Sequence, residues 1–226
     1  MTSANKIINE LSSHRYALFK TFFSKSKYNF NSKKIKNFKK FKTIIIIGMG
    51  GSILGSKAIY SFLKHKIEKK FIFIDNLDQG YLWKIKKENN LNRSLFLIIS
   101  KSGNTTETIT NSSFFRSFLK KNNSIVISED KDNALRNFAK KKDIYFVRHH
   151  PNIGGRYSVF SDAGMLPVYF MGLKPERFKN NIPNLLNNKK LLSNNMKKIA
   201  KINDKKIKVL VLFNYVPELN SFMFWC

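Results

Sequence analysis

The sequence predicts an α/β fold: a doubly wound, parallel, five-stranded sheet with flanking helices, followed by the start of a second α/β domain. Short apolar runs alternate with helix-like segments between residues 43 and 147, and such alternation is typical of a parallel sheet with crossover helices. The first run, Thr43–Ile47, holds four consecutive isoleucines, as expected for a strand buried on both faces. A later apolar run within Lys206–Tyr215 indicates that a second domain begins near the end of the chain.

The N-terminal part, residues 1–42, is predicted to hold one helix and a connector. Apolar residues recur at nearly helical spacing in Asn5–Phe23, which favours an amphipathic helix. The following segment, Ser24–Lys42, is rich in lysine and weakly patterned. We therefore expect it to connect the helix to the sheet.

Residues 43–173 form the predicted ligand-binding domain. Its expected strands are Thr43–Ile47, Phe71–Asp75, Ser94–Ile99, Ser124–Ser128 and Asp143–Val147. Its expected helices are Ser52–His65, Gln79–Asn89, Thr105–Lys121, Lys131–Lys140 and Val159–Leu173, the last with a kink at Pro167. Ligands of such sheets bind at the carboxyl ends of the strands, so the turns after the strands are the expected site.

Residues 174–226 are predicted to hold linker helices and the truncated start of the second domain. Lys174–Asn203 is polar and lysine-rich, Lys206–Tyr215 has the pattern of a strand, and Pro217–Trp225 has that of a helix. A single strand and a partial helix cannot bury their own apolar surface. We therefore expect the chain to stop inside its second domain.

A glycine-rich turn follows the first strand directly. Gly48, Gly50, Gly51 and Ser52 stand between the isoleucine run and the next helix. Glycines let the backbone turn tightly and approach a ligand, and a helix start presents N–H groups to an anion. The spacing fits neither a dinucleotide fingerprint nor a P-loop. It suits a single phosphate monoester, although such a turn also serves plain packing of a helix on a sheet.

Hydroxyl groups gather after the third strand, in the segment Ser100–Thr108. Ser100, Lys101, Ser102 and Thr105 are its candidate ligand-binding residues, because each hydroxyl can donate to a phosphate oxygen and lysine adds a positive charge. Thr105 or Thr106 could instead be an ordinary helix cap. Two such segments at the ends of strands in one sheet favour a shared anionic ligand.

A third segment, Gly154–Ser161, places two glycines before Arg156. Glycines allow a guanidinium to be held in a tight space, where its planar set of donors stays charged. This arrangement suits a developing enolate or a substrate oxygen. The alternative is a turn with a surface arginine.

The composition excludes several classes of protein. The formal net charge is +28, and a high positive charge is common in nucleic-acid-binding proteins. Here, however, the lysines are spread from Lys6 to Lys208 and occur together with abundant asparagine, isoleucine and phenylalanine. We therefore interpret the charge as compositional and predict no nucleic-acid partner. One cysteine, Cys226, excludes an internal disulfide, and no apolar run is long enough to span a membrane. A cytoplasmic location without a membrane partner is predicted.

The remaining titratable residues indicate no metal site. His149 and His150 precede Pro151 on a predicted loop; a proton shuttle is conceivable there, but exposed loop histidines are the commoner case. His14 and His65 are expected at the surface. Asp75, Asp78 and Asp162 make no metal cluster, so no metal site is expected.

Three of these motifs resemble, in order and spacing, the signature segments of the glucose-6-phosphate isomerase family. They are Gly48–Ser52, Ser100–Thr108 and Gly154–Ser161, and the segment Tyr215–Trp225 looks like the family segment that leads into its Gln-Leu-x-x-Glu-Ser motif. The first two motifs are shared with sugar-isomerase (SIS) domains in general, whereas the Gly-Gly-Arg-x-Ser segment narrows the resemblance to the isomerase. The resemblance covers about residues 43–226 and implies an SIS-type sheet.

The resemblance implies a role for each matching residue. Gly51 and Ser52 match positions that contact the sugar phosphate, and Ser100, Lys101, Ser102 and Thr105 match the phosphate cradle. Arg156 matches the arginine that stabilises the enediolate. The family interconverts glucose 6-phosphate and fructose 6-phosphate without a metal or organic cofactor and forms dimers.

The chain departs from the family pattern in one respect. The family's base glutamate, histidine and C-terminal lysine lie beyond the Trp225 region, and Glu218 precedes the matching segment. Because acid–base catalysis contributes orders of magnitude, little turnover is expected from this chain alone. Gly103 and Asn104 also differ from the bulkier sequence of many members, which leaves the exact sugar open. The alternative function is a non-catalytic SIS-domain protein that binds a sugar phosphate, which would leave the Gly-Gly-Arg segment unexplained.

Overall fold

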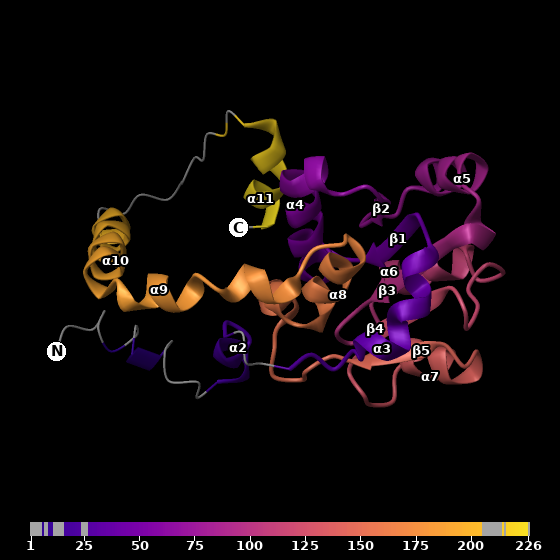
Figure 1. Cartoon of the computed structure of the whole chain (residues 1–226), viewed down its shortest axis with the longest axis horizontal. Coiled ribbons are helices and arrows are strands. Elements are labelled where there is room, and N and C mark those ends of the chain that lie inside the picture. The colour runs from indigo at the N-terminus through magenta and orange to yellow at the C-terminus, as the bar shows by residue number, and fades with distance from the viewer. Residues whose placement is uncertain are drawn as a thin grey trace.

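The computed structural model describes residues 6, 9–10, 16–23, 27–204, 214 and 216–225. Its centre is a parallel five-stranded sheet in the order β2-β1-β3-β4-β5, shown in Figure 1. The strands are β1 Thr43–Gly48, β2 Lys70–Ile74, β3 Ser94–Ile99, β4 Ser124–Ser128 and β5 Tyr145–Arg148. All five predicted strands are confirmed, with β3 and β4 at the predicted bounds and the others shifted by one or two residues at their ends.

Each face of the sheet is covered by helices, because side chains alternate between the faces along each strand. One apolar cluster joins Ile45 and Ile47 of β1 to α5 Gln79–Glu88, α7 Ala134–Lys141 and the residues after α6 Thr106–Phe114. The other joins Ile44 and Ile46 to α4 Leu54–Leu63 and α8 Asp162–Phe170. The fully buried isoleucine run of β1 is thus explained by apolar layers on both sides.

The helices predicted after β3 and β4 have different bounds in the structure. The helix predicted over Thr105–Lys121 ends at Phe114. Ser112 there bonds back to the Thr108 carbonyl at 2.7 Å, which competes with helix continuation, and buried Phe115 then leads into a series of turns. The helix predicted from Lys131 begins at Ala134, because Asn133 adopts extended backbone and caps it.

The helix predicted over Ser52–His65 is shorter in the structure. It is α4, which is preceded by the 3-10 turn η2 Gly50–Ser52 and followed by the 3-10 turn η3 Lys64–Lys66. Gly154–Ser161 contains the 3-10 helix η5 Gly155–Phe160. The helix predicted over Val159–Leu173 therefore begins only at Asp162, and Pro167 lies inside it as expected.

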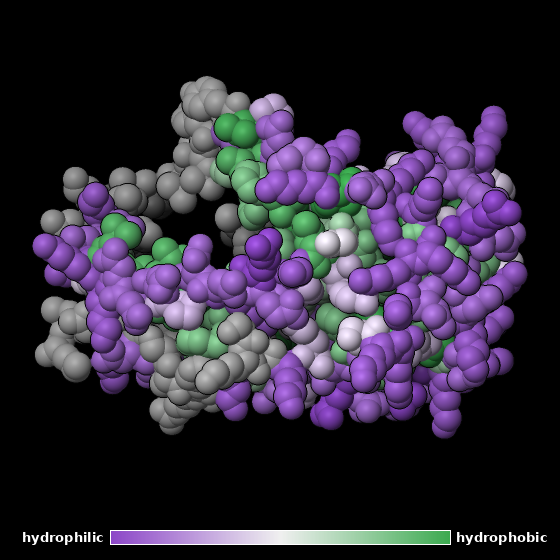
Figure 2. Space-filling view, viewed as in Figure 1, coloured by the Kyte–Doolittle hydropathy of each residue, from purple (hydrophilic) through white to green (hydrophobic). Residues whose placement is uncertain are grey.

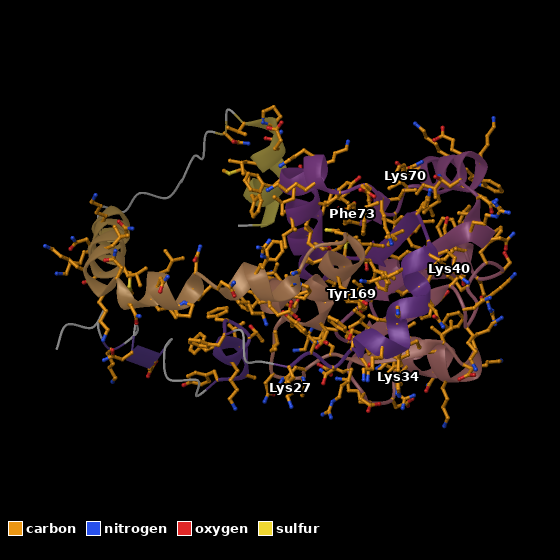
Figure 3. All side chains as sticks on the ribbon, in the orientation of Figure 1. Lys27, Lys34, Lys40, Lys70, Phe73 and Tyr169 are labelled. Carbon is orange, nitrogen blue, oxygen red and sulfur yellow. The ribbon has the colours of Figure 1, made fainter. Side chains whose placement is uncertain are left out.

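The lysine-rich connector packs closely against the domain. It contains α3 Ser32–Ile35 and η1 Lys36–Lys40, and it buries Phe30, Ile35, Phe38 and Phe41 in the core. The buried carboxylate of Asp162 holds it in place by accepting the backbone N–H groups of Asn29 and Phe30 at 2.6 and 3.2 Å. The Phe30 ring lies 6.0 Å from that of Tyr169, which is labelled in Figure 3. The sequence of this segment has no clear hydrophobic periodicity, so the burial of these four residues was not predicted.

The flanking segments are partly described. Of the predicted N-terminal helix, the structure shows α2 Ala17–Lys20. After α8 come η6 Pro175–Lys179, α9 Ile182–Asn187 and α10 Lys189–Asp204, and the last two extend away from the sheet in Figure 1. Of the predicted strand Lys206–Tyr215, all but Asn214 lies outside the described residues.

The predicted final helix is present as η7 Pro217–Leu219 and α11 Asn220–Trp225. It lies against α4, where Ser61 donates to the Glu218 carbonyl at 3.1 Å and the rings of Phe62 and Phe222 lie 5.8 Å apart. No helix among the described residues is long and apolar enough to cross a bilayer.

Candidate functional site

The two predicted ligand-binding turns leave adjacent strands of the sheet. Gly48 at the end of β1 is paired with Ile99 at the end of β3. In the strand order 2-1-3-4-5 the crossover connections leave β1 and β3 in opposite directions, and ligands bind in the crevice at this switch point. The topology therefore brings together the two turns that the sequence marked separately.

The turn after β1 keeps its backbone donors available. Gly50 has a φ of +52°, a conformation that glycine adopts without strain, and the backbone then forms one 3-10 turn through Ser52 before α4 begins. Ser52 and Ile53 donate to carbonyls of the turn. In the described part of the chain, no acceptor is found for the N–H groups of Gly50 and Gly51, which an anion could fill.

The hydroxyl groups after β3 form a connected cluster. The Ser100 hydroxyl is 2.8 Å from that of Thr105, which is 3.4 Å from that of Ser102. Thr105 occupies the cap position of α6, yet its side chain makes no capping hydrogen bond. Simple capping therefore does not account for this threonine, and the cluster can rearrange its protons to donate to an anion.

Backbone donors add to the hydroxyl cluster. Within the described residues, no hydrogen bond uses the N–H groups of Lys101, Ser102 or Thr105. Gly103 has a φ of +70°, which turns the loop back toward α6. Hydroxyls, unpaired N–H groups and the start of a nine-residue helix thus lie in one short loop, which is the composition of an anion site.

Lys101 is held beside a carboxylate that sequence reasoning missed. Its ammonium lies 3.6 Å from Glu129, and the other oxygen of Glu129 is paired with Lys131 at 2.5 Å. The hydrogen bond from Lys131, together with the charges of both lysines, holds the pKa of Glu129 below its usual value. Because Lys131 already neutralises Glu129, Lys101 can turn to a phosphate without leaving a bare carboxylate. The position of Glu129 could have indicated this role, because it directly follows β4 at the edge of the sheet where the carboxyl ends of the strands lie.

The third segment packs directly on the first. A Cβ placed on Gly51 would lie 2.3 Å from the carbonyl carbon of Gly155 and 2.4 Å from the Arg156 nitrogen, so only glycine permits this approach. The Ser158 hydroxyl, which is buried, lies within hydrogen-bonding distance of the Gly51 and Gly155 carbonyls, at 3.2 and 2.7 Å. Sequence reasoning placed Ser158 in the motif without giving it this role.

Arg156 itself is exposed, and none of the ion pairs in the described part of the chain involves it. Its backbone nitrogen is fixed beside Gly51 by the contact between η2 and η5. The backbone of Arg156 is therefore fixed next to the turn after β1, and its charged side chain is exposed.

The expectation that the loop histidines are exposed is wrong for His149. This residue follows β5, is 1% exposed, and donates its backbone N–H to the Ser128 carbonyl at 2.7 Å. Its ring Nδ1 lies 3.0 Å from the His150 carbonyl, and burial lowers its pKa. His149 extends the β4–β5 pairing by one residue, which explains its burial.

The described residues contain no group of three or more histidine, cysteine, aspartate or glutamate side chains that could hold a metal ion. Asp75 instead pairs with Lys57 at 2.6 Å, Asp78 caps α5, and Asp162 fastens the connector. All seven predicted site residues lie in the three segments described above.

The fold defines a class: a doubly wound, parallel α/β domain with two donor-rich turns at the switch point of its sheet. The hypothetical protein TT0462 from Thermus thermophilus shares the fold with a TM-score of 0.68 at 20% identity, over 81% of this chain and 47% of that one. The glucose-6-phosphate isomerase from Chlamydia trachomatis matches with a TM-score of 0.55 at 26% identity, over 62% of this chain and 28% of that one.

The sequence comparisons identify the family. The family model described as phosphoglucose isomerase matches residues 11–208, and this chain belongs to that family. The glucose-6-phosphate isomerase of Methanocaldococcus jannaschii is 32% identical over 208 residues, which are 88% of this chain and 52% of the relative. The chain thus spans about half the length of this relative.

Proposed function

We propose that this chain binds the phosphate group of a hexose 6-phosphate and takes part in the interconversion of glucose 6-phosphate and fructose 6-phosphate. The observation that carries the proposal is the convergence of three segments at the β1–β3 switch point. Two of them offer unpaired N–H and hydroxyl donors, and the third anchors an arginine beside the first. Membership of the phosphoglucose isomerase family supports the same reaction.

In this proposal the phosphate occupies the cradle of Gly51, Ser52, Ser100, Lys101, Ser102 and Thr105. Backbone N–H groups and hydroxyls donate to the phosphate oxygens, and Lys101 supplies positive charge. Binding the remote phosphate fixes the position of the reacting carbons, and such positioning is a large part of catalysis.

Arg156 has the role of stabilising charge at the sugar end. Isomerisation moves a proton between C2 and C1 through an enediolate, which carries negative charge on its oxygens. Because the Gly51–Gly155 contact fixes the Arg156 backbone beside the cradle, its guanidinium can reach this charge and donate to it as it develops. The proposal assigns no proton transfer to the three motifs, whose contribution is binding and charge stabilisation.

Calorimetry with fructose 6-phosphate and with fructose tests the phosphate cradle. We expect the phosphate ester to bind at least tenfold more tightly, and Ser102→Ala to weaken it by about tenfold, the loss typical of a hydrogen bond to a charged group. Ser113→Ala on the exposed side of α6 is the matched control and leaves affinity unchanged. Equal affinities for the ester and the free sugar would contradict the cradle.

The second candidate is a non-catalytic sugar-phosphate-binding protein. The donor-rich turns alone would support either function, whereas the anchored Arg156 favours the isomerase. A coupled assay that follows fructose 6-phosphate formation separates the two, since binding without turnover in a form that includes the proton-transferring residues would favour the binding protein.

The proposal extends to a homodimer in the cytoplasm, for which the support is the family alone. Sedimentation of a catalytically active form would test the dimer. A monomer that isomerises at full rate would contradict it.

A further inference from the structure

The loop that carries the proposed cradle also caps α7, the helix that follows the neighbouring strand β4. The first three N–H groups of α7 need acceptors, because a helix cannot supply them internally. Ala134 donates to the Asn104 side chain at 2.8 Å, and Leu135 donates to the Gly103 carbonyl at 3.1 Å. The third, from Arg136, goes to the Asn133 side chain at 2.8 Å. Two of the three acceptors therefore come from the loop after β3.

Asn133 packs against the same loop and is itself fixed by hydrogen bonds at the end of β4. It is 4% exposed, and its amide nitrogen donates to the Glu129 and Lys131 carbonyls, each at 3.0 Å. Gly103 presses against it so closely that an added Cβ would lie 1.9 Å from the Asn133 Oδ1. The position of Asn133 thus limits where Gly103 can sit.

The contacts divide the loop into two sides. The carbonyls of Lys101 and Gly103 and the side-chain oxygen of Asn104 accept hydrogen bonds from the β4–α7 segment, the first from Glu129 at 2.9 Å. The N–H groups of Lys101, Ser102 and Thr105 are the ones left without acceptors in the described part of the chain. The loop thus uses its oxygen acceptors toward the β4–α7 segment, while three of its N–H donors remain available to a ligand.

We propose that Asn104 and Asn133 are positioning residues that fasten the loop after β3 to α7 and thereby preorganise its donors for a phosphate ester. This inference rests on the proposed function, and it assigns neither residue a contact with the ligand. A loop ordered before binding loses less conformational entropy on binding, which raises affinity without any new contact. Ordering a few backbone residues in advance corresponds to roughly tenfold or more in affinity.

Asn104→Ala tests the inference, because Asn104 is exposed and its removal leaves the core intact. We expect faster amide hydrogen exchange at Gly103, Glu129 and Leu135, whose N–H groups are hydrogen-bonded in this contact, and about tenfold weaker binding of fructose 6-phosphate. Asn137→Ala is the matched control: Asn137 is exposed on the same helix and bonds to Asp132, so neither quantity changes. Asn104→Asp keeps an oxygen acceptor for Ala134 and should retain the slow exchange of the wild type.

The two measurements separate the possible failures. If the wild type binds fructose 6-phosphate and Asn104→Ala binds it with the same affinity, the positioning role is overturned, whether or not amide exchange becomes faster. Weaker binding with unchanged exchange would also overturn it, because the loss would then come from a direct contact. No binding of fructose 6-phosphate by the wild type would overturn the proposed function and this inference with it.

Discussion

Gly51→Ala is the substitution that most directly tests the contact between the turn after β1 and the Arg156 segment. The new Cβ would lie 2.3 Å from the Gly155 carbonyl carbon and 2.4 Å from both the Gly155 oxygen and the Arg156 nitrogen. All three are backbone atoms, so no side-chain rotation can relieve the clash.

The size of the effect follows from that geometry. Ordinary contact begins at 3.4 Å, so the two backbones must separate by about 1 Å. Forcing an extra methyl group into a packed site costs about 1–3 kcal/mol of stability. A displacement of about 1 Å at a catalytic group can lower its contribution by about a hundredfold.

Urea denaturation and calorimetry with fructose 6-phosphate measure the two consequences. We expect the free energy of unfolding of Gly51→Ala to fall by about 1–3 kcal/mol. We expect the affinity for the ester to fall as well, because the N–H groups of Gly50 and Gly51 move with the turn.

Gly155→Ala is the matched control, since a Cβ there would meet no atom within 4 Å. Its stability and affinity should stay close to the wild type. The reasoning is refuted if Gly51→Ala is as stable and binds as well as Gly155→Ala, because the close backbone approach would then have no energetic consequence.

Three further predictions concern charge. In a form of the protein that catalyses the isomerisation, Arg156→Ala should lower kcat by about a hundredfold or more, as for loss of a donor to a developing oxyanion; an unchanged kcat would remove Arg156 from the mechanism. Burial lowers the pKa of Lys179 from 10.5 to about 8, so the unfolded chain binds more protons between these values. The free energy of unfolding should therefore rise with pH from 8 toward 10.5, by up to about 3 kcal/mol, and Lys179→Met should flatten this rise in denaturation measured at each pH. Binding to duplex DNA should be weak and independent of sequence at physiological salt, because the lysines labelled in Figure 3 lie apart and the visible face also carries apolar residues, green in Figure 2. Nanomolar, sequence-selective binding in a mobility-shift assay would show a nucleic-acid site.

Much of the fold was predictable because its signals are local. Isoleucine runs, glycine turns and their alternation with helical segments identify each strand without knowledge of its neighbours. Helix ends were predicted less well, since they depend on competing side chains: Ser112 bonds back to Thr108, and Asn133 caps α7 after a predicted start at Lys131.

The burial of individual residues was harder to predict from the sequence. His149 and the connector residue Phe30 read as parts of surface segments, yet both are buried. Their burial results from distant partners, namely the end of β4 for His149 and Asp162 with Tyr169 for the connector. A single sequence carries little information about such long-range pairing.

The sequence by itself determined the α/β class and the five strands, and it singled out the three segments of the candidate site, because strand burial and backbone turns depend on neighbouring residues. Only the tertiary structure decided how those segments meet. Strand order places the ends of β1 and β3 side by side, and the missing side chain of Gly51 lets the Arg156 backbone approach it. It also joins the loop after β3 to α7 through the hydrogen bond from Ala134 to Asn104. These are contacts between residues 30 to more than 100 positions apart, and packing rather than local propensity selects them.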